Sequence, residues 1–252
     1  MTTRNPTGLL SKDASAPQRG ELTRGETLFK LAFGAIQWPW LLRSLYGGKL
    51  EEKDRLLDRI GLPRDALPHL GSWKADTYLL HRIVDVIEQT RPAQVVELGS
   101  GASSLVMAQA LSRNGGGQLI SYDQHQPFSE EMGRWLAEHG LSADFRHAPL
   151  TRRDPAWPGL WYALDDVPAR IDLMVIDGPP WTVHPYVRGT AECLFTRLSP
   201  GAVVMLDDAA RPGERLVARR WRRNWPDMTF VLETAGSKGL LMGRTPGKDK
   251  FV

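Results

Sequence analysis

The feature that most constrains the fold is an apolar run that leads through two glycines directly into a helical pattern. Residues 95–104 read Val-Val-Glu-Leu-Gly-Ser-Gly-Ala-Ser-Ser. Gly99 and Gly101 allow a tight turn and a close approach of the backbone to a ligand. The start of the following helix presents free N–H groups, which suit a carboxylate or a phosphate. A strand, a turn and a helix in this order predict a ligand site at the carboxyl edge of an open parallel sheet.

From residue 73 onward, strand patterns alternate with helix patterns. The predicted strands are 94–98, 118–122, 144–147, 172–176, 202–206, 229–233 and 239–243. The predicted helices are 77–89, 103–113, one that begins at Ser129 and ends at Gly140, and one that begins near Gly213. Such alternation indicates an α/β fold, a doubly wound and mostly parallel sheet with helices on both faces. Residues 234–238 are too few for a helical crossover, so the last two strands should form an antiparallel hairpin.

The residues before this domain have a different character. Residues 1–24 are rich in small and polar types without periodicity, which predicts a mobile tail. Residues 25–72 form a predicted helical extension of the domain 73–252, with helices over 26–46 and 51–60. Pro39 should kink or end the first of these helices. We interpret this helix as a lid or an added core helix, with a weak membrane-surface contact or a homodimer contact as the alternatives.

Composition and charge exclude several classes of protein. The chain has 32 basic and 29 acidic residues, a net charge of +3, which does not favour a dedicated nucleic-acid binder. No segment is apolar enough for a transmembrane helix, and the first residues lack the pattern of a signal peptide. The single cysteine, Cys193, excludes an intramolecular disulfide and fits a reducing compartment, so we predict a cytoplasmic location. Because Cys193 lies in an apolar helical run, its thiol should be buried and inert.

Acidic residues follow three of the predicted strands. Asp123 ends the strand 118–122, where a carboxylate can accept hydrogen bonds from the two hydroxyls of a ribose. NAD enzymes use an acid at the same place, so Asp123 indicates a nucleoside without choosing between cofactors; a capping or solvated turn acid is the alternative. Asp177 follows an apolar strand and precedes Gly-Pro-Pro. Asp207 and Asp208 end the strand 202–206 and should reach the same edge of the sheet.

Together these motifs resemble the class I S-adenosylmethionine-dependent methyltransferases. The resemblance covers residues 73–244 and rests on Glu-Leu-Gly-Ser-Gly, the acid after the next strand, Ile-Asp-Gly-Pro-Pro, Leu-Ser-Pro-Gly and the closing hairpin. It implies a Rossmann-like, seven-stranded sheet. The sequences at 147–150 and 207–211 resemble a branch that is similar to enzymes methylating sugars and other small molecules. One departure is that Ser103 stands where the family commonly has a third glycine.

The resemblance implies a set of site residues for S-adenosylmethionine. The glycine turn and its serines would surround the methionine part, Asp123 and its neighbour the ribose, and residues 148–150 the adenine. The implied cofactor-binding residues are Glu97, Gly99, Ser100, Gly101, Ser103, Ser104, Asp123, Gln124, Ala148, Pro149, Leu150 and Asp177. Asp177 would also face the methyl group that is transferred.

Methyl transfer to a hydroxyl requires a base, because a neutral hydroxyl is a poor nucleophile. Asp177, His184 and Asp208 are the candidates, and His184 lies in a loop that should hang over the site. Asp177, Asp207 and Asp208 are also oxygen ligands suited to Mg²⁺, so a divalent metal stays open. Adjacent strand residues point to opposite sides, so only one of Asp207 and Asp208 should face the site.

The leading hypothesis is therefore a methyltransferase that acts on a small-molecule or saccharide acceptor, with oxygen as the favoured acceptor atom. An NAD-dependent oxidoreductase and a non-catalytic nucleoside-binding module are the alternatives. Ser104 stands where a dinucleotide fingerprint wants glycine or alanine, which argues against NAD. The basic run 215–223 predicts either a solvated helix face or a patch that binds phosphate or uronate groups. Trp38, Trp40, Trp73 and Trp181 are expected near the acceptor entrance, mostly as packing residues.

Overall fold

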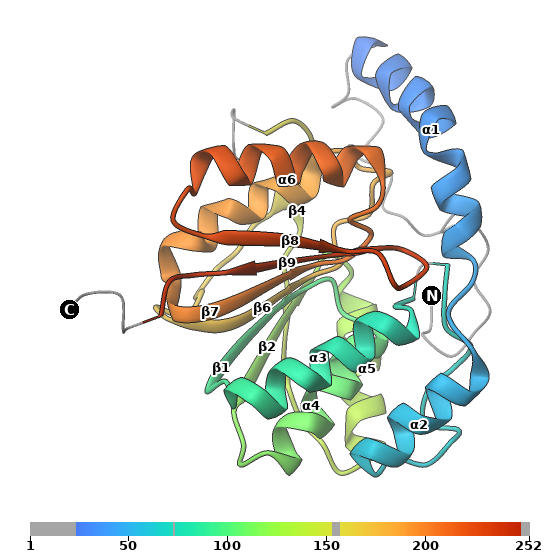
Figure 1. Ribbon diagram of the computed structural model, residues 1–252, viewed down its shortest axis with the longest axis vertical. Coiled ribbons are helices and arrows are strands. Elements are labelled where there is room, and N and C mark those ends of the chain that lie inside the picture. Colours follow the sequence, from blue (N-terminus) through green and yellow to red (C-terminus); the bar gives the residue numbers. More distant parts are fainter. Residues whose placement is uncertain (1–23, 73, 153–156, 248–252) are drawn as a thin grey trace.

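The computed structural model describes residues 24–72, 74–152 and 157–247. Within these residues, a twisted sheet of seven strands forms the centre of the fold (Figure 1). The strands are β1 Gln94–Leu98, β2 Gln118–Asp123, β3 Asp144–His147, β6 Ile171–Ile176, β7 Leu198–Leu206, β8 Thr229–Glu233 and β9 Leu240–Arg244, in the order β3-β2-β1-β6-β7-β9-β8. Strand β9 is antiparallel to β7 and β8, and the other pairs are parallel. The mostly parallel sheet and the closing hairpin are thus confirmed.

The helices are α1 Arg24–Ser44, α2 Leu50–Ile60, α3 Thr77–Thr90, α4 Ala102–Arg113, α5 Gln126–Glu138, the 3₁₀ helix η1 Val187–Arg197 and α6 Pro212–Asn224. Helices other than α1 cover both faces of the sheet. Because successive side chains of a strand point to opposite faces, Val95 enters the core under α2 to α5 and Val96 enters the core under η1 and α6. The central strands β1, β6 and β7 are therefore apolar on both faces, whereas the edge strands β3 and β8 have no fully buried residue.

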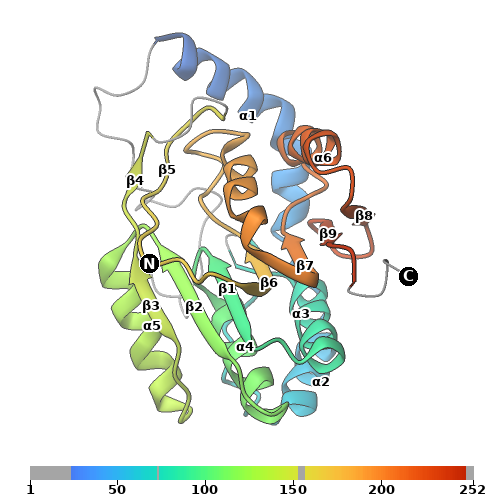
Figure 2. The same ribbon diagram turned by 90° about the vertical axis from the view of Figure 1, so that its left-hand side faces the viewer.

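The first helix passes across the carboxyl ends of the parallel strands (Figure 2). Contacts at three places in α1 hold it there. The ring of Phe29 stacks on His184 with 5.4 Å between centroids. A Cβ at Gly34 would lie 3.2 Å from the Trp181 ring. The guanidinium of Arg43 donates to the carbonyl of Gly236 at 3.4 Å. This helix therefore covers the edge of the sheet where the acidic residues end their strands.

Helix α1 continues through Pro39 to Ser44, so the proline does not end the helix, and the kink given as the other outcome stays a prediction. Two other local predictions were wrong. Helix α5 starts before Ser129 because Pro127 supplies a favourable first turn. Cys193 is exposed rather than buried. It lies in η1, whose three residues per turn replace the α-helical period from which its burial was predicted.

Two other expectations stay predictions. The tail 1–24 lies outside the described residues apart from Arg24, and so does Trp73. The outer side of α1 exposes apolar side chains, among them Leu31 and Trp38, and the alternative of a membrane-surface or homodimer contact through this helix stays a prediction. Within the described ranges, no helix combines the length and the apolar character that crossing a bilayer requires.

Candidate active site

The turn between β1 and α4 combines one crowded glycine with one open glycine. Gly99 has φ of 94°, and a Cβ there would lie 2.7 Å from the backbone nitrogen of Gly178. Only glycine fits where the ends of β1 and β6 approach so closely. At Gly101 a Cβ would meet no atom within 4 Å. Open space therefore lies directly in front of the turn, where the N–H groups of α4 begin.

Behind this turn, the buried carboxylate of Glu97 organises the serines. Its Oε1 accepts a hydrogen bond from Ser103 Oγ at 2.6 Å. Its Oε2 accepts from Ser104 Oγ and from Ser121 Oγ, each at 2.5 Å. Burial raises the pKa of Glu97 to about 7, and these three hydroxyls lower it only in part. Because Glu97 has no exposed surface, its side chain holds the turn in place from behind and does not itself line the open space.

Asp123 lies beside the same turn and is joined to it by hydrogen bonds. Its Oδ2 accepts from the amide of Ser100 at 3.1 Å, and its Oδ1 accepts from the amide of His125 at 2.9 Å. Ser100 Oγ also lies 2.8 Å from Ser121 Oγ, which completes a chain of hydrogen bonds to Glu97. Burial raises the pKa of Asp123 to about 6. A carboxylate offers about four acceptor positions, so Asp123 keeps capacity for a diol.

The segment expected at the adenine lies next to the end of β2. The amide of Ala148 donates to the carbonyl of Asp123 at 2.8 Å. Pro149 is exposed, and Leu150 begins β4 Leu150–Thr151, which pairs with β5 Trp161–Tyr162. Gln124 is half-buried, and its carbonyl lies 3.1 Å from His147 Nε2. The structure thus brings this segment and the glycine turn to the two sides of Asp123.

Tyr162 is a residue of this region that the sequence patterns did not indicate. It is fully buried, and its hydroxyl lies against the Cα of Gly178, where any Cβ would clash with it. Burial raises the pKa of this hydroxyl well above its usual value, and the charges of Asp123 and Asp177 act in the same direction. The only signal in the sequence is an aromatic pair, Trp161-Tyr162, in a stretch without a recognisable period.

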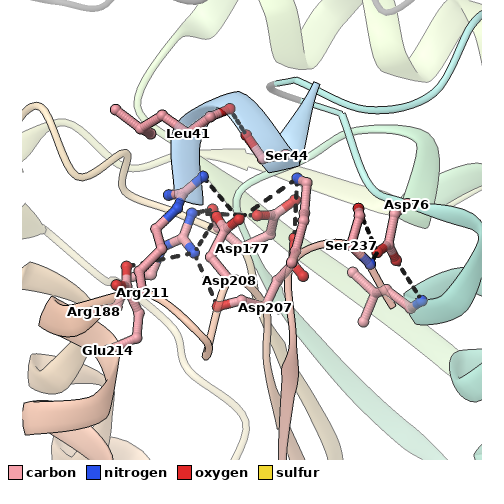
Figure 3. Close-up of polar contacts among 12 residues, drawn as sticks. Leu41, Ser44, Asp76, Asp177, Arg188, Asp207, Asp208, Arg211, Glu214 and Ser237 are labelled. Carbon is pink, nitrogen blue, oxygen red and sulfur yellow. Dashed lines mark hydrogen bonds and ion pairs between the residues drawn. The ribbon is translucent and has the colours of Figure 1, made fainter. Parts of the chain in front are cut away.

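The three acids at the ends of β6 and β7 come together in one cluster (Figure 3). Oxygens of Asp177, Asp207 and Asp208 all lie within 4.8 Å of one another. The expectation that only one of Asp207 and Asp208 faces the site is wrong. Strand β7 ends at Leu206, and Asp208 adopts a left-handed conformation with φ of 59°, which turns its side chain back beside Asp207.

Three buried cations surround these acids, and sequence reasoning assigned none of them a role in the site. Arg188 lies 2.9 Å from Asp208 Oδ2 and 3.2 Å from Asp177 Oδ1. Arg211 lies 2.8 Å from Asp208 Oδ1. Lys238 Nζ lies 3.3 Å from Asp207 Oδ2 and 3.8 Å from Asp208 Oδ1. These pairs are buried, so solvent and salt screen them little.

The three acids differ in how well their environments suit the role of a base. Burial would raise the pKa of Asp208, but Arg211, Lys238 and Arg188 together lower it to about 2, which makes Asp208 a poor base. Burial raises the pKa of Asp207 well above its usual value. Burial also raises the pKa of Asp177, and its side chain is 15% exposed, against 2–3% for the other two. Asp177 is therefore the acid best placed to accept a proton from a bound molecule.

His184 lies under α1 in an aromatic cluster rather than over an open site. Its Nδ1 accepts a hydrogen bond from the amide of Tyr186 at 3.1 Å, which occupies that nitrogen. Its ring is 4% exposed and lies between Phe29 and Tyr186. This environment supports packing as the main role of His184.

The residues present do not fit a divalent metal ion at the acidic cluster. Mg²⁺ and Ca²⁺ bind carboxylate oxygens that are free to coordinate them, usually together with water. Here Asp177 is paired with Arg188, Asp207 with Lys238, and Asp208 with both arginines. The three acids that left a divalent metal open in the sequence therefore already have their counter-charges.

Comparisons with known proteins agree with this geometry. Residues 96–209 match the family model of a methyltransferase domain. The chain is similar to the O-methyltransferase TomG from Streptomyces achromogenes, solved with SAM, at 16% identity and a TM-score of 0.52, covering 90% of this chain and 100% of that one. It is also similar to the O-methyltransferase from Bacillus cereus, solved with SAH, at 13% identity and a TM-score of 0.53, covering 86% and 99%.

A methyltransferase from Geobacter sulfurreducens is similar at 16% identity and a TM-score of 0.51, covering 85% of this chain and 96% of that one. No curated protein matches the sequence. The sheet order and these structures show the Rossmann-like fold of methyltransferases, and residues 96–209 are similar to a methyltransferase domain. The match begins at Val96 within β1 and includes the glycine turn, Asp123, Asp177 and the Asp207–Asp208 pair.

Proposed function

We propose that this chain transfers a methyl group from S-adenosylmethionine to an oxygen atom of a small-molecule or saccharide acceptor. The observation that carries the proposal is the turn 99–101, which is braced by Glu97 from behind, bonded to Asp123 at its side and open in front of Gly101. This donor set fits an adenosyl cofactor: amides at a helix start for its carboxylate and Asp123 for its ribose. The cofactor supplies a methyl group already activated by the sulfonium charge.

The protein's own part in the reaction is to orient the acceptor, exclude water and take its proton. Asp177 is our candidate for that proton, because it ends β6 beside Gly99 and is the most exposed acid of the cluster. Arg188 holds its Oδ1 at 3.2 Å, which fixes the orientation of the carboxylate. Helix α1 excludes water by covering this edge of the sheet.

A buried polar residue on the inner face of α1 supports an acceptor pocket beneath this helix. Gln37 is fully buried, and within the described residues neither its amide nitrogen nor its amide oxygen has a hydrogen-bond partner. It lies one turn from Phe33 and one turn from Leu41, both buried on the same face. Trp181 Nε1, Thr182 Oγ1 and Arg211 Nε likewise lack hydrogen-bond partners there. Buried polar groups usually have hydrogen-bond partners, so these polar atoms without partners are suited to a ligand that carries hydroxyl groups.

Replacing Gln37 with leucine should stabilise the protein and weaken the enzyme. Leucine has a similar volume and removes a buried amide that lacks partners, so we expect a gain of about 1–2 kcal/mol in unfolding free energy. Methyl transfer should fall at least ~10-fold because the acceptor loses a hydrogen-bonding group. Thermal melting and release of S-adenosylhomocysteine check the two effects. If Q37L is less stable than the wild type, the amide has structural partners and the pocket assignment fails.

A basic pocket next to this region supports an acceptor that carries an anionic group. The pocket has a volume of about 620 Å³ and is lined by Trp157, Tyr186, Leu216, Arg219, Arg220, Arg222 and Arg223. The described residues provide no hydrogen-bond or ion-pair partner for Arg219 and Arg223, which are four residues apart on α6. Like charges at this spacing are unfavourable without a counter-charge. Tyr186 also contacts Phe33 at 5.4 Å, so the pocket adjoins the aromatic cluster under α1.

The double variant R219A/R223A should weaken binding of an anionic probe without changing cofactor affinity. With inorganic pyrophosphate as the probe, we expect calorimetry to give at least ~10-fold weaker binding, since each charge-assisted hydrogen bond contributes roughly 1.5–3 kcal/mol. R134A is the matched control, because Arg134 is also an exposed arginine on a helix. If wild type and double variant bind pyrophosphate equally, α6 presents only a solvated face.

Calorimetric titration with S-adenosylmethionine and with NADH tests the proposal against its alternatives. The methyltransferase proposal requires binding of the former, and an oxidoreductase requires binding of the latter. A non-catalytic nucleoside-binding module would bind the methyl donor but release no S-adenosylhomocysteine with any extract that contains acceptors. If the protein binds neither S-adenosylmethionine nor S-adenosylhomocysteine, the proposal is refuted.

A further inference from the structure

We infer that the ammonium group of Lys238 takes the place of a divalent metal ion among Asp177, Asp207 and Asp208. If Lys238 replaces the metal ion, methyl transfer needs no metal, and this consequence rests on the function proposed above. The assignment of Lys238 as the cation rests only on the geometry of the cluster.

The three carboxylates have the spacing of ligands to a single ion. Their nearest oxygens lie within 4.8 Å of one another. Oxygen atoms bound to one Mg²⁺ or Ca²⁺ lie about 2.0–2.6 Å from the ion, so two ligands are separated by at most about 5 Å. Carboxylates brought this close repel one another strongly unless a cation lies between or beside them. The cluster is therefore built for a cation.

Lys238 supplies that cation from within the chain. Its side chain is 2% exposed, and its Nζ contacts Asp207 at 3.3 Å and Asp208 at 3.8 Å. Burial alone would lower the pKa of Lys238, but the charges of Asp207, Asp208 and Asp177 outweigh it and raise the pKa, so the group stays charged. An ammonium is a compact point charge, which makes it the side chain most similar to a small metal ion.

The loop that carries Lys238 is held from three directions. The amide and hydroxyl of Ser237 donate to Asp76 Oδ2 at 2.8 and 3.0 Å, and Asp76 also caps the start of α3. The carbonyl of Lys238 accepts from the amide of Ala210 at 3.1 Å, just beyond the acidic pair. Arg43 of α1 donates to Gly236. This support fixes the backbone from which the ammonium enters the cluster.

Removal of the ammonium should convert the cluster into a metal site. Lys238→Ala leaves Asp207 and Asp208 facing the space that Nζ occupied, with an oxygen of Asp177 within 4.8 Å of both. Arg188 and Arg211 remain paired with Asp208. A divalent ion that entered this space would replace the lost charge and satisfy Asp207, whose nearest cation is Lys238. Affinity for a metal ion is therefore expected to appear in the variant and to be absent from the wild type.

Electron paramagnetic resonance of Mn²⁺ tests this inference directly, because bound Mn²⁺ loses the sharp signal of the free ion. After treatment with chelator, the wild type should leave the signal of added Mn²⁺ unchanged. K238A should remove the signal of about one ion per chain. The matched control D207N/K238A, which lacks one ligand, should restore the free signal. Circular dichroism of each sample establishes that the variants are folded.

A wild type that binds Mn²⁺ through this cluster, with binding lost in D207N, would overturn the inference, and this arm does not depend on the folding of K238A. A folded K238A that leaves the signal unchanged would overturn it as well. Titration of the same wild-type sample with S-adenosylmethionine reports separately on the proposed function. If that titration fails while the Mn²⁺ pattern holds, the cation assignment stands and the methyltransferase proposal falls.

Discussion

Replacing Gly101 with leucine is expected to weaken binding of S-adenosylmethionine by at least ~100-fold, or about 2.7 kcal/mol, while the protein stays folded. The backbone of Gly101 is extended, with φ of 174°, and a Cβ there meets no atom within 4 Å. A leucine side chain therefore enters the space in front of the turn without strain. The unfolding free energy should change by about 1 kcal/mol at most, the usual scale of a change at an N-cap.

Titration calorimetry measures the loss of affinity, and thermal melting measures the fold. Gly99→Ala is the matched comparison, because it should have the opposite profile. Its Cβ would lie 2.7 Å from the backbone of Gly178 at a residue with φ of 94°, so this variant should lose stability by several kcal/mol. If G101L binds the cofactor as tightly as the wild type does, the cofactor does not lie in front of the turn.

Replacing Asp177 with asparagine is expected to reduce methyl transfer by ~10²–10⁴-fold, the usual contribution of a positioned base. Asparagine keeps the shape of the side chain but removes its capacity to take a proton. Arg188 keeps its ion pair with Asp208 at 2.9 Å, so the cluster should remain assembled. Affinity for S-adenosylmethionine should change little, because the turn and Asp123 are untouched.

Release of S-adenosylhomocysteine in the presence of acceptor-containing extract measures this effect. Asp227→Asn is the control, because Asp227 is exposed in the turn between α6 and β8 and should leave the rate unchanged. D177N activity within ~2-fold of the wild type would contradict a role of Asp177 as the base. Binding of the cofactor in the same variant separates a catalytic loss from a loss of structure.

The sheet could be predicted because its signals are local. Most of the strands carry an apolar run of their own, several turns carry glycines or prolines, and the hairpin follows from a loop of only a few residues. The acids of the site could be predicted for the same reason, since the carboxyl ends of parallel strands meet at one edge. Asp123 and the turn at Gly99 are indeed joined by a hydrogen bond to Ser100.

The parts that could not be predicted depend on contacts between distant segments. Lys238 reaches Asp207 from 31 residues away, and Arg188 reaches Asp208 from 20 residues away. No periodicity marks either residue. The turn that brings Asp208 beside Asp207 requires a positive φ at a residue other than glycine, which strand alternation does not indicate. The sequence placed His184 in a loop over an open site. In the folded protein α1 covers this loop, and the sequence pattern could not indicate this because α1 is far away in the chain.

A crystal structure of the protein with S-adenosylhomocysteine tests the central claim most directly. The account predicts that the ribose hydroxyls donate to Asp123, that the amino-acid part lies in front of Gly101, and that the sulfur faces Asp177. A ligand bound away from the turn at 99–101, with Asp123 making only the backbone contacts described above, would contradict it.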